Sequence, residues 1–339
     1  MEKESKATFS LVILSLIIVL LFTMIFSFGL GRYNISIGTI IKILLSKIIT
    51  IKQDWKIEVE LVLFGIRLPR ILIAVLVGMG LSISGCVYQG VFQNPMASPN
   101  VLGTSSASAF GAVLGILISL PENLVFSSAF IFGLFSIFLV YLIGSRFGDK
   151  QILSIILAGI MISSIFSAST SLIKLIADPN DKLPEITYWL MGGLGGSSYE
   201  NLLFILVPLL IGFIPLFIFR WRLNILTLSE DEARSIGVNT SKLRILALFC
   251  ATLITSSTVA CCGVISWVGL VIPNLARKLV GNDYRKLFPI SALMGGLFLL
   301  LVDDIARNLL VSEIPLGILT SFVGAPFFLY LMIRKGKKK

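Results

Sequence analysis

Long apolar runs, separated by polar or Gly/Pro-rich breaks, dominate this chain of 339 residues. A transmembrane helix needs about 20 predominantly apolar residues, and ten runs approach or reach that length. Only 14% of the residues are charged, whereas soluble domains carry about 25%. The sequence therefore predicts an all-α integral membrane protein, folded as a single transmembrane domain over 1–339. Its ten expected spans are 9–29, 67–90, 99–119, 123–144, 152–176, 199–219, 245–262, 267–280, 289–306 and 315–333.

The first run is the one segment that a signal peptide could explain, because a short charged head precedes it. It is long enough to span the membrane, however, and no clean small-x-small cleavage site follows it. We therefore expect a retained first transmembrane helix.

The distribution of lysine and arginine predicts the orientation. With the N-terminus in the cytoplasm, 18 of the 28 basic residues fall in cytoplasmic segments and 10 fall outside. Cytoplasmic loops carry the excess of basic residues, so both termini are predicted to be cytoplasmic. The first outside loop is an exception, since its apolar stretch 35–52 includes Lys42, Lys47 and Lys52. This pattern favours a helix lying in the membrane interface, and an eleventh span is the alternative.

The segment 93–103 breaks the regular backbone between two apolar spans. It holds two prolines and two asparagines. Unpaired backbone amides cost several kcal/mol in hydrocarbon, so such a break survives only at a membrane edge, inside protein or along a water-filled cavity. The motif Arg67-Leu68-Pro69-Arg70 opens the preceding span. Together the two segments predict a passage with a charged rim at one membrane face and a constriction at the other.

No catalytic motif is present. The sequence lacks a phosphate-binding P-loop, a Gly-x-Ser-x-Gly elbow and a His-Glu-x-x-His zinc motif. Asp303 and Asp304 are adjacent, so on a helix their side chains point about 100° apart and do not face each other. The chain is therefore not expected to be an enzyme.

Metal and cofactor chemistry is not expected either. The chain has no histidine, and its four cysteines form no Cys-x-x-Cys pair. We predict no cofactor, no metal site and no disulfide framework.

The net charge of +10 is assigned to basic loops against anionic lipid, not to nucleic-acid binding. Ionisable groups are scarce in the middles of the spans, which disfavours an ion-coupled secondary transporter. The energy that drives transport is then expected to come from another subunit.

The cytoplasmic loop 220–244 contains a short helix with strong end signals. Ser229 suits the N-cap, Glu232 completes a capping box, and Gly237 suits the left-handed residue that ends a helix. A rigid helix of this kind can be held by a partner protein. A plain surface helix is the alternative.

Motifs along nearly the whole chain resemble those of FecCD-type permeases. This family supplies the membrane subunits of ABC importers for iron–siderophores, haem and cobalamin. The resemblance implies a type II ABC importer permease architecture, with two permeases around a central path. The matching stretches are Arg67-Leu68-Pro69-Arg70, Ser84-Gly85, Gln89, Asn94-Pro95-Met96-Ala97, Pro99, Leu102-Gly103, Leu157-Ala158-Gly159, Trp189, Gly192-Gly193, Glu232-Ala233, Gly237-Val238, Gly269-Leu270-Val271-Ile272-Pro273, Ala276-Arg277, Asp304, Ala306-Arg307, Glu313-Ile314-Pro315-Leu316-Gly317, Gly324 and Pro326-Phe327-Phe328.

The resemblance also implies three sets of functional residues. The arginines would sit at the outer mouth and meet acidic side chains of a substrate-binding protein, where charge complementarity sets docking register; the alternative is snorkelling to lipid headgroups. A cytoplasmic gate would close the inner end of the path by excluding water. The helix of the 220–244 loop would seat in a groove of the ATPase. The sets are Arg67, Arg70 and Arg307 for docking, Asn94, Met96, Ile152 and Leu153 for the gate, and Glu232, Ala233 and Gly237 for coupling.

The chain departs from many relatives at one position, since Asn274 follows Pro273 where a histidine is common. Asparagine can still donate and accept a hydrogen bond, but it cannot titrate. The resemblance predicts a permease that moves iron(III)-siderophore across a bacterial cytoplasmic membrane. Its partners would be a pair of ABC ATPase subunits, an extracytoplasmic binding protein, and a second copy or a sister permease. Haem import, cobalamin import and an ion-coupled secondary transporter stay open as alternatives.

Overall fold

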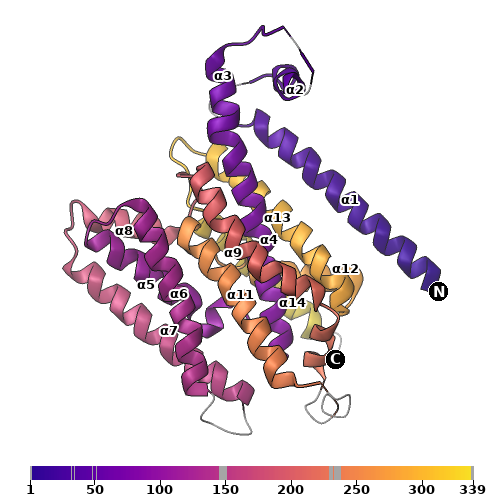
Figure 1. Cartoon of the computed structure of the whole chain (residues 1–339), viewed down its shortest axis with the longest axis vertical. Helices are drawn as coiled ribbons and strands as arrows, with labels where there is room; N and C mark the ends of the chain where they lie inside the picture. The colour runs from indigo at the N-terminus through magenta and orange to yellow at the C-terminus, as the bar shows by residue number, and fades with distance from the viewer. Residues whose placement is uncertain are drawn as a thin grey trace.

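The computed structural model describes residues 2–31, 33, 35–47, 49–50, 52–144, 151–228, 232 and 238–336. These parts of the chain form helices and no strands (Figure 1). In chain order the helices are α1 (Glu2–Gly29), α2 (Ile37–Ser46), α3 (Ile57–Leu61), the π-helical turn η1 (Val62–Arg67), α4 (Leu68–Val91), η2 (Pro99–Leu102), α5 (Thr104–Leu117), α6 (Glu122–Gly144), α7 (Gln151–Ile176), α8 (Lys182–Met191), α9 (Tyr199–Ile218), η4 (Arg222–Thr227), α11 (Thr240–Cys262), α12 (Val268–Val280), α13 (Tyr284–Asn308) and α14 (Leu316–Gly336).

Each of the ten predicted spans coincides with a helix, which confirms the all-helical membrane class. Seven helical segments are long and apolar enough to cross a membrane by length and composition. The other three predicted spans correspond to α5, α12 and α14. The first two have only 14 and 13 residues, which is below the length that a perpendicular crossing needs.

Helix α4 is the centre of the structure. It packs against α13, α11, α12 and α9, whereas α5 to α8 form a group on one side that packs on α11 through α5 and α6 (Figure 1). Glycines allow its close contacts, because a Cβ at Gly78 would lie 2.2 Å from the carbonyl oxygen of Gly295 on α13. Small residues let helix backbones approach closely in membranes. By contrast, α1 lies at the edge and packs mainly on α13.

The helical segment that contains α4 begins earlier than predicted. It runs from Ile57 to Val91, where the sequence favoured a start at position 67. The π-helical turn η1 ends two residues before Pro69. Proline lacks a backbone N–H and crowds the preceding turn, so the local change of hydrogen-bond register accommodates it without ending the helix. Arg67, the last residue of the turn, and Arg70, one turn further on, are both buried.

The loop between α1 and α4 contains the short helix α2, within the stretch predicted to be helical. Ser36 caps it, since its Oγ accepts a hydrogen bond from the backbone N–H of Thr39 at 3.2 Å. The helix has ten residues, about half the length that a span needs, so an eleventh span is wrong. Its lysines are paired, Lys42 with Asp54 and Lys47 with Glu60.

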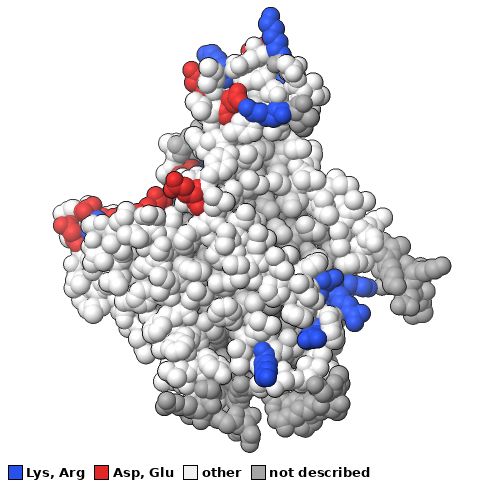
Figure 2. Space-filling model, viewed as in Figure 1, with Lys and Arg blue, Asp and Glu red and all other residues white. Residues whose placement is uncertain are grey.

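Helix α8 was not predicted. It begins at Lys182 and ends at Met191, between two spans. Its first turn contains Pro184 and Glu185, and Ile186 is buried. Charged side chains are unevenly spread over the face shown in Figure 2. Apart from the α2–α3 region at the top, which carries both signs, acidic residues lie on the upper left and basic residues toward the lower end.

Candidate functional site

The three arginines predicted at the outer mouth are buried. The exposed fractions are 5% for Arg67, 8% for Arg70 and 7% for Arg307. A buried guanidinium is stable only when charged partners and hydrogen bonds compensate for its lost hydration. Three carboxylates and backbone carbonyls supply them. We call Arg67, Arg70, Arg307, Asp303, Asp304 and Glu313 the arginine–carboxylate network.

Arg70 joins two carboxylates from different segments. Its Nη2 lies 2.9 Å from Oδ1 of Asp303 on α13, and its Nε also donates to that carboxylate. Its Nη1 and Nη2 donate to the two carboxylate oxygens of Glu313, at 2.9 and 3.0 Å. Bidentate pairs of this kind are strong and orientation-specific. Arg70 therefore fixes α4 to α13 and to the connector that leads into α14.

Arg307 and Arg67 fix α1 to the same network. Nη2 of Arg307 pairs with Asp304 and donates to the carbonyl oxygen and the hydroxyl of Ser27, at 2.8 and 2.6 Å. Arg67 donates to the carbonyl oxygens of Phe28 and Tyr33. Asp303 accepts its hydrogen bonds from Arg70, whereas Arg307 pairs with Asp304 and also places its Nε 3.8 Å from Oδ2 of Asp303. Sequence reasoning missed these partners, and docking to a binding protein stays a prediction.

The 93–103 loop has a defined fold. The Oδ1 of Asn94 accepts from the backbone N–H of Met96 at 2.9 Å, and the carbonyl of Asn94 accepts from Ala97 at 3.0 Å. Asn274 on α12 donates through Nδ2 to the carbonyl oxygen of Pro95 at 2.9 Å. Met96 is 50% exposed. The loop is therefore held by α12 while it presents an apolar side chain to the surroundings.

The far end of this loop lies against α7, the helix that carries the other two predicted gate residues. A Cβ at Gly159 would lie 2.1 Å from the carbonyl oxygen of Val101. Ile152 is half-buried and Leu153 is 51% exposed, about two turns away from that contact. The structure thus brings the loop and α7 together. Closure of a path by these side chains stays a prediction.

One face of α7 is exposed in the isolated chain, although the helix is apolar. Only 28% of its membrane-spanning window is buried. Hydroxyl side chains share this face with aliphatic ones, and they recur at the helical spacing of Ser164, Ser167 and Ser171. Hydroxyls are suited to a helix–helix interface or a polar path. The face can offer uncharged hydrogen-bonding groups to a passing solute or a second subunit.

The predicted coupling helix lies largely outside the described residues, which excludes Ala233 and Gly237 from the structure. Glu232 is described, and it is helical and exposed. The segment η4 leads into this region and is anchored by the buried side chains of Leu223, Ile225 and Leu226. Gln93 donates to the carbonyl oxygens of Leu226 and Leu228, a contact to which sequence reasoning gave no role.

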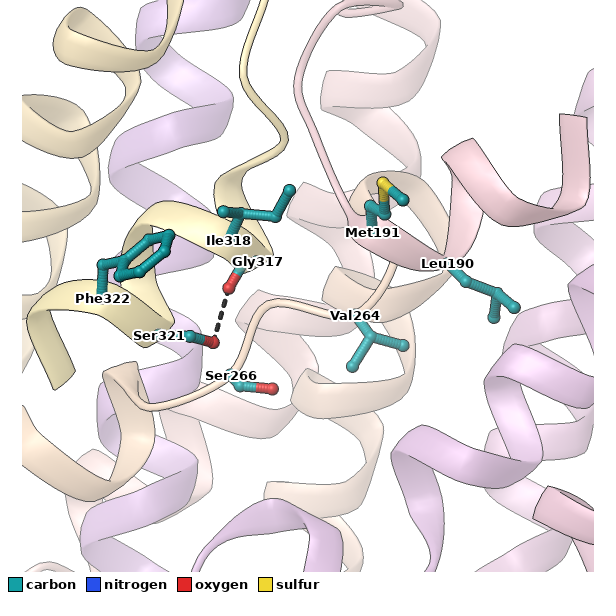
Figure 3. Close-up of a pocket in the computed structure, with 8 residues that line it drawn as sticks. All are labelled: Leu190, Met191, Val264, Ser266, Gly317, Ile318, Ser321 and Phe322. Carbon is teal, nitrogen blue, oxygen red and sulfur yellow. Dashed lines mark hydrogen bonds between the residues drawn. The ribbon is translucent and has the colours of Figure 1, made fainter. Parts of the chain in front are cut away.

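A pocket of about 530 Å³ lies between the end of α8, the α11–α12 connector and the start of α14 (Figure 3). Ser321 donates to the carbonyl oxygen of Gly317 at 2.7 Å and so satisfies its own hydroxyl. The lining carries no charge. It comprises Leu190, Met191, Val264, Ser266, Gly317, Ile318, Ser321 and Phe322. Among the described residues, no group of three or more His, Cys, Asp or Glu is placed to hold a metal ion.

A family model described as the FecCD transport family matches residues 18–334. The chain belongs to the FecCD transport family. Its sequence is 42% identical to the molybdate import system permease protein MolB of Haemophilus influenzae over 94% of each chain. It is 41% identical to a probable iron chelatin transport system permease protein of Helicobacter pylori, covering 82% of this chain and 84% of that protein.

A solved structure supports the same assignment. A metal-chelate type ABC transporter in an inward-facing conformation superposes with a TM-score of 0.85 at 40% identity, covering 95% of this chain and 98% of the other. The FecCD chain described here is therefore an ABC importer permease, a multi-pass membrane subunit and not an enzyme. Its family works with a separate ATPase, a substrate-binding protein and a second permease. An ion-coupled secondary transporter is accordingly the wrong class.

Proposed function

We propose that this permease forms, with a second copy or a sister chain, the path by which iron(III)-siderophore crosses the bacterial cytoplasmic membrane. The exposed face of α7 carries the proposal, because it combines apolar side chains with Ser164, Ser167 and Ser171, and the one charged residue of α7, Lys174, lies in its last turn. Such a surface suits a weakly binding path for a bulky solute. Selection of the cargo then rests with the binding protein.

Molybdate is the second candidate cargo. The 42% identity to a molybdate permease over 94% of each chain favours it. Haem and cobalamin are further candidates, because a cobalamin permease and a hemin permease are 38% and 37% identical to this chain.

Uptake by cells with and without this chain tests the cargo. Radiolabelled ferric siderophores, haem, cobalamin and molybdate are each supplied to both strains. Loss of siderophore uptake alone supports the proposal, and complementation by the intact gene is the control. Loss of molybdate uptake with unchanged iron uptake would move the assignment to the second candidate.

The proposed orientation places both termini in the cytoplasm and the arginine–carboxylate network near the outer face. The positive-inside rule and the uneven charge in Figure 2 support it. Docking of a binding protein near Arg67 is then expected. Since charge reversal at a buried arginine would also disturb folding, a photo-crosslinking residue at the neighbouring Ile66 is the cleaner test. Ile66 is 59% exposed, and Leu203 on α9, at 60%, is a matched control.

Capture of the binding protein from position 66 but not from 203 is the expected result. Equal or absent capture at both positions would contradict docking at this site.

The ATPase is proposed to bind the helix around Glu232, Ala233 and Gly237. Gly237→Val should prevent recovery of the ATPase with the permease, because a β-branched residue opposes a left-handed helix end. Recovery of the intact complex would count against that contact.

A further inference from the structure

We propose that Gln93 transmits motion from the ATPase-coupling segment to the cytoplasmic gate. This inference rests on the proposed function, and it assigns the task to one side chain. The Gln93 link comprises Gln93 and the two carbonyl groups that it binds, those of Leu226 and Leu228. Nε2 of Gln93 donates to them at 3.0 and 2.9 Å. Both protons of the carboxamide are therefore used on one short segment.

The backbone at Gln93 supports a special role. Its φ is +50°, and among the described residues only Ser119 and Trp267 are other non-glycine residues with positive φ. The left-handed region is unfavourable for residues with a Cβ, and outliers of this kind often lie at functional sites. Glycine would adopt this φ readily, but it would lack the carboxamide. The side-chain hydrogen bonds give a physical reason for glutamine at this position.

One end of the link is the start of the coupling region. Leu226 belongs to η4, and Leu228 directly precedes residues 229–237. Besides the link, η4 is fixed through Asn224, which donates to Asp283 and accepts from the backbone N–H of Tyr284, both at 2.9 Å. A displacement of the coupling segment will therefore act on η4 and, through it, on Gln93.

The other end is the 93–103 loop. Gln93 immediately precedes Asn94 and lies three residues before Met96, two of the proposed gate residues. The loop continues to the backbone contact between Val101 and Gly159 on α7. The loop is short and internally hydrogen-bonded. A displacement of Gln93, the first residue of the loop, therefore moves Asn94 and Met96 together, because the hydrogen bonds within the loop keep it rigid.

The test uses the complete importer, with its ATPase and binding protein, in proteoliposomes. Uptake per ATP hydrolysed is measured with radiolabelled molybdate and a radiolabelled ferric hydroxamate siderophore. Gln93→Leu keeps the size but removes both donors, and Gln93→Gly removes the side chain while accepting the positive φ. Gln53→Leu is the matched control, because Gln53 donates to Trp55 in the α2–α3 loop, far along the chain. Uptake per ATP should fall about thirtyfold in both Gln93 variants, the factor expected for two neutral hydrogen bonds.

ATP hydrolysis and the thermal midpoint of Gln93→Gly should stay near wild type, which a merely structural role would not allow. Unchanged uptake per ATP in both Gln93 variants would overturn the link. A cargo-independent measurement accompanies it: the distance between spin labels at Met96→Cys in the two permeases, with and without trapped ATP. The distance should change in wild type and not in Gln93→Leu. If neither probe is accumulated, the proposed cargo fails, while equal distance changes in both proteins would overturn the link alone.

Discussion

Arg70 on α4 and Asp303 on α13 form a buried ion pair, with 2.9 Å between Nη2 and Oδ1 and no exposure of the Asp303 side chain. The two residues are 233 positions apart in sequence. Arg70 also holds Glu313. This one guanidinium therefore determines how the central helix, α13 and the connector into α14 are placed relative to one another.

Removing one member of this pair should destabilise the permease strongly. Asp303→Leu leaves the Arg70 charge with only Glu313, and loss of one partner of a buried pair costs about 3–5 kcal/mol. The double variant Arg70→Met with Asp303→Leu should be less damaging than the sum of the two single variants. Thermal unfolding of the purified protein in detergent gives the double-mutant cycle.

The exposed pair Lys42–Asp54 is the matched control for that cycle. Its side chains are 53% and 56% exposed, and exposed pairs contribute about 0–1 kcal/mol. Lys42→Ala should therefore leave the unfolding midpoint almost unchanged. Additive effects of the Arg70 and Asp303 variants would show that the two residues do not act as a pair.

Ser27 should be important for holding α1. Its hydroxyl donates to Oδ1 of Asp304 and accepts from Arg307, both at 2.6 Å, and it is fully buried. Hydrogen bonds to charged groups contribute about 1.5–3 kcal/mol each, so Ser27→Ala should lower the thermal midpoint by several degrees. Ser15→Ala removes an exposed hydroxyl from the same helix and should have little effect. Equal midpoints for the two variants would remove Ser27 from this role.

The sequence predicts the spans well because hydrocarbon requires long apolar runs, and all ten runs became helices. It predicts the irregular 93–103 loop because the prolines and asparagines there interrupt the apolar runs. It does not reveal the partners of Arg70, because Asp303 and Glu313 are more than 230 residues away and only packing brings them near. Helix α8 was missed because its ten residues form too short a pattern. The early start at Ile57 was missed because Glu58 and Glu60 interrupt the apolar run.

Gly85 should tolerate no side chain. A Cβ there would lie 1.8 Å from the carbonyl oxygen of Gly269, so α4 and α12 would have to move apart. Overpacking costs about 1–3 kcal/mol, and more where the backbone must shift. Gly85→Ala should therefore reduce the yield of folded, monodisperse protein in size-exclusion chromatography. Gly65→Ala is the control in the same helical segment, because a Cβ at Gly65 meets nothing within 4 Å.

Asn274 should keep the 93–103 loop in place through its amide donor. Its Nδ2 donates to the carbonyl oxygens of Pro95 and Leu270, at 2.9 and 2.8 Å. Asn274→Asp and Asn274→Leu both lack a donor, whereas Asn274→His keeps one. A net loss of about 1 kcal/mol per neutral hydrogen bond corresponds to a roughly fivefold larger population of the open loop.

Hydrogen exchange followed by mass spectrometry measures this population at the amides of Met96 and Ala97, which donate to Asn94. Exchange should be faster in the Asp and Leu variants, and it should be closer to wild type in the His variant. The comparison separates hydrogen bonding from side-chain volume, because Leu resembles Asn in size while His is larger. If the His variant exchanges as fast as the Leu variant, the donor is not what holds the loop, and the packing around Pro95 must do so instead.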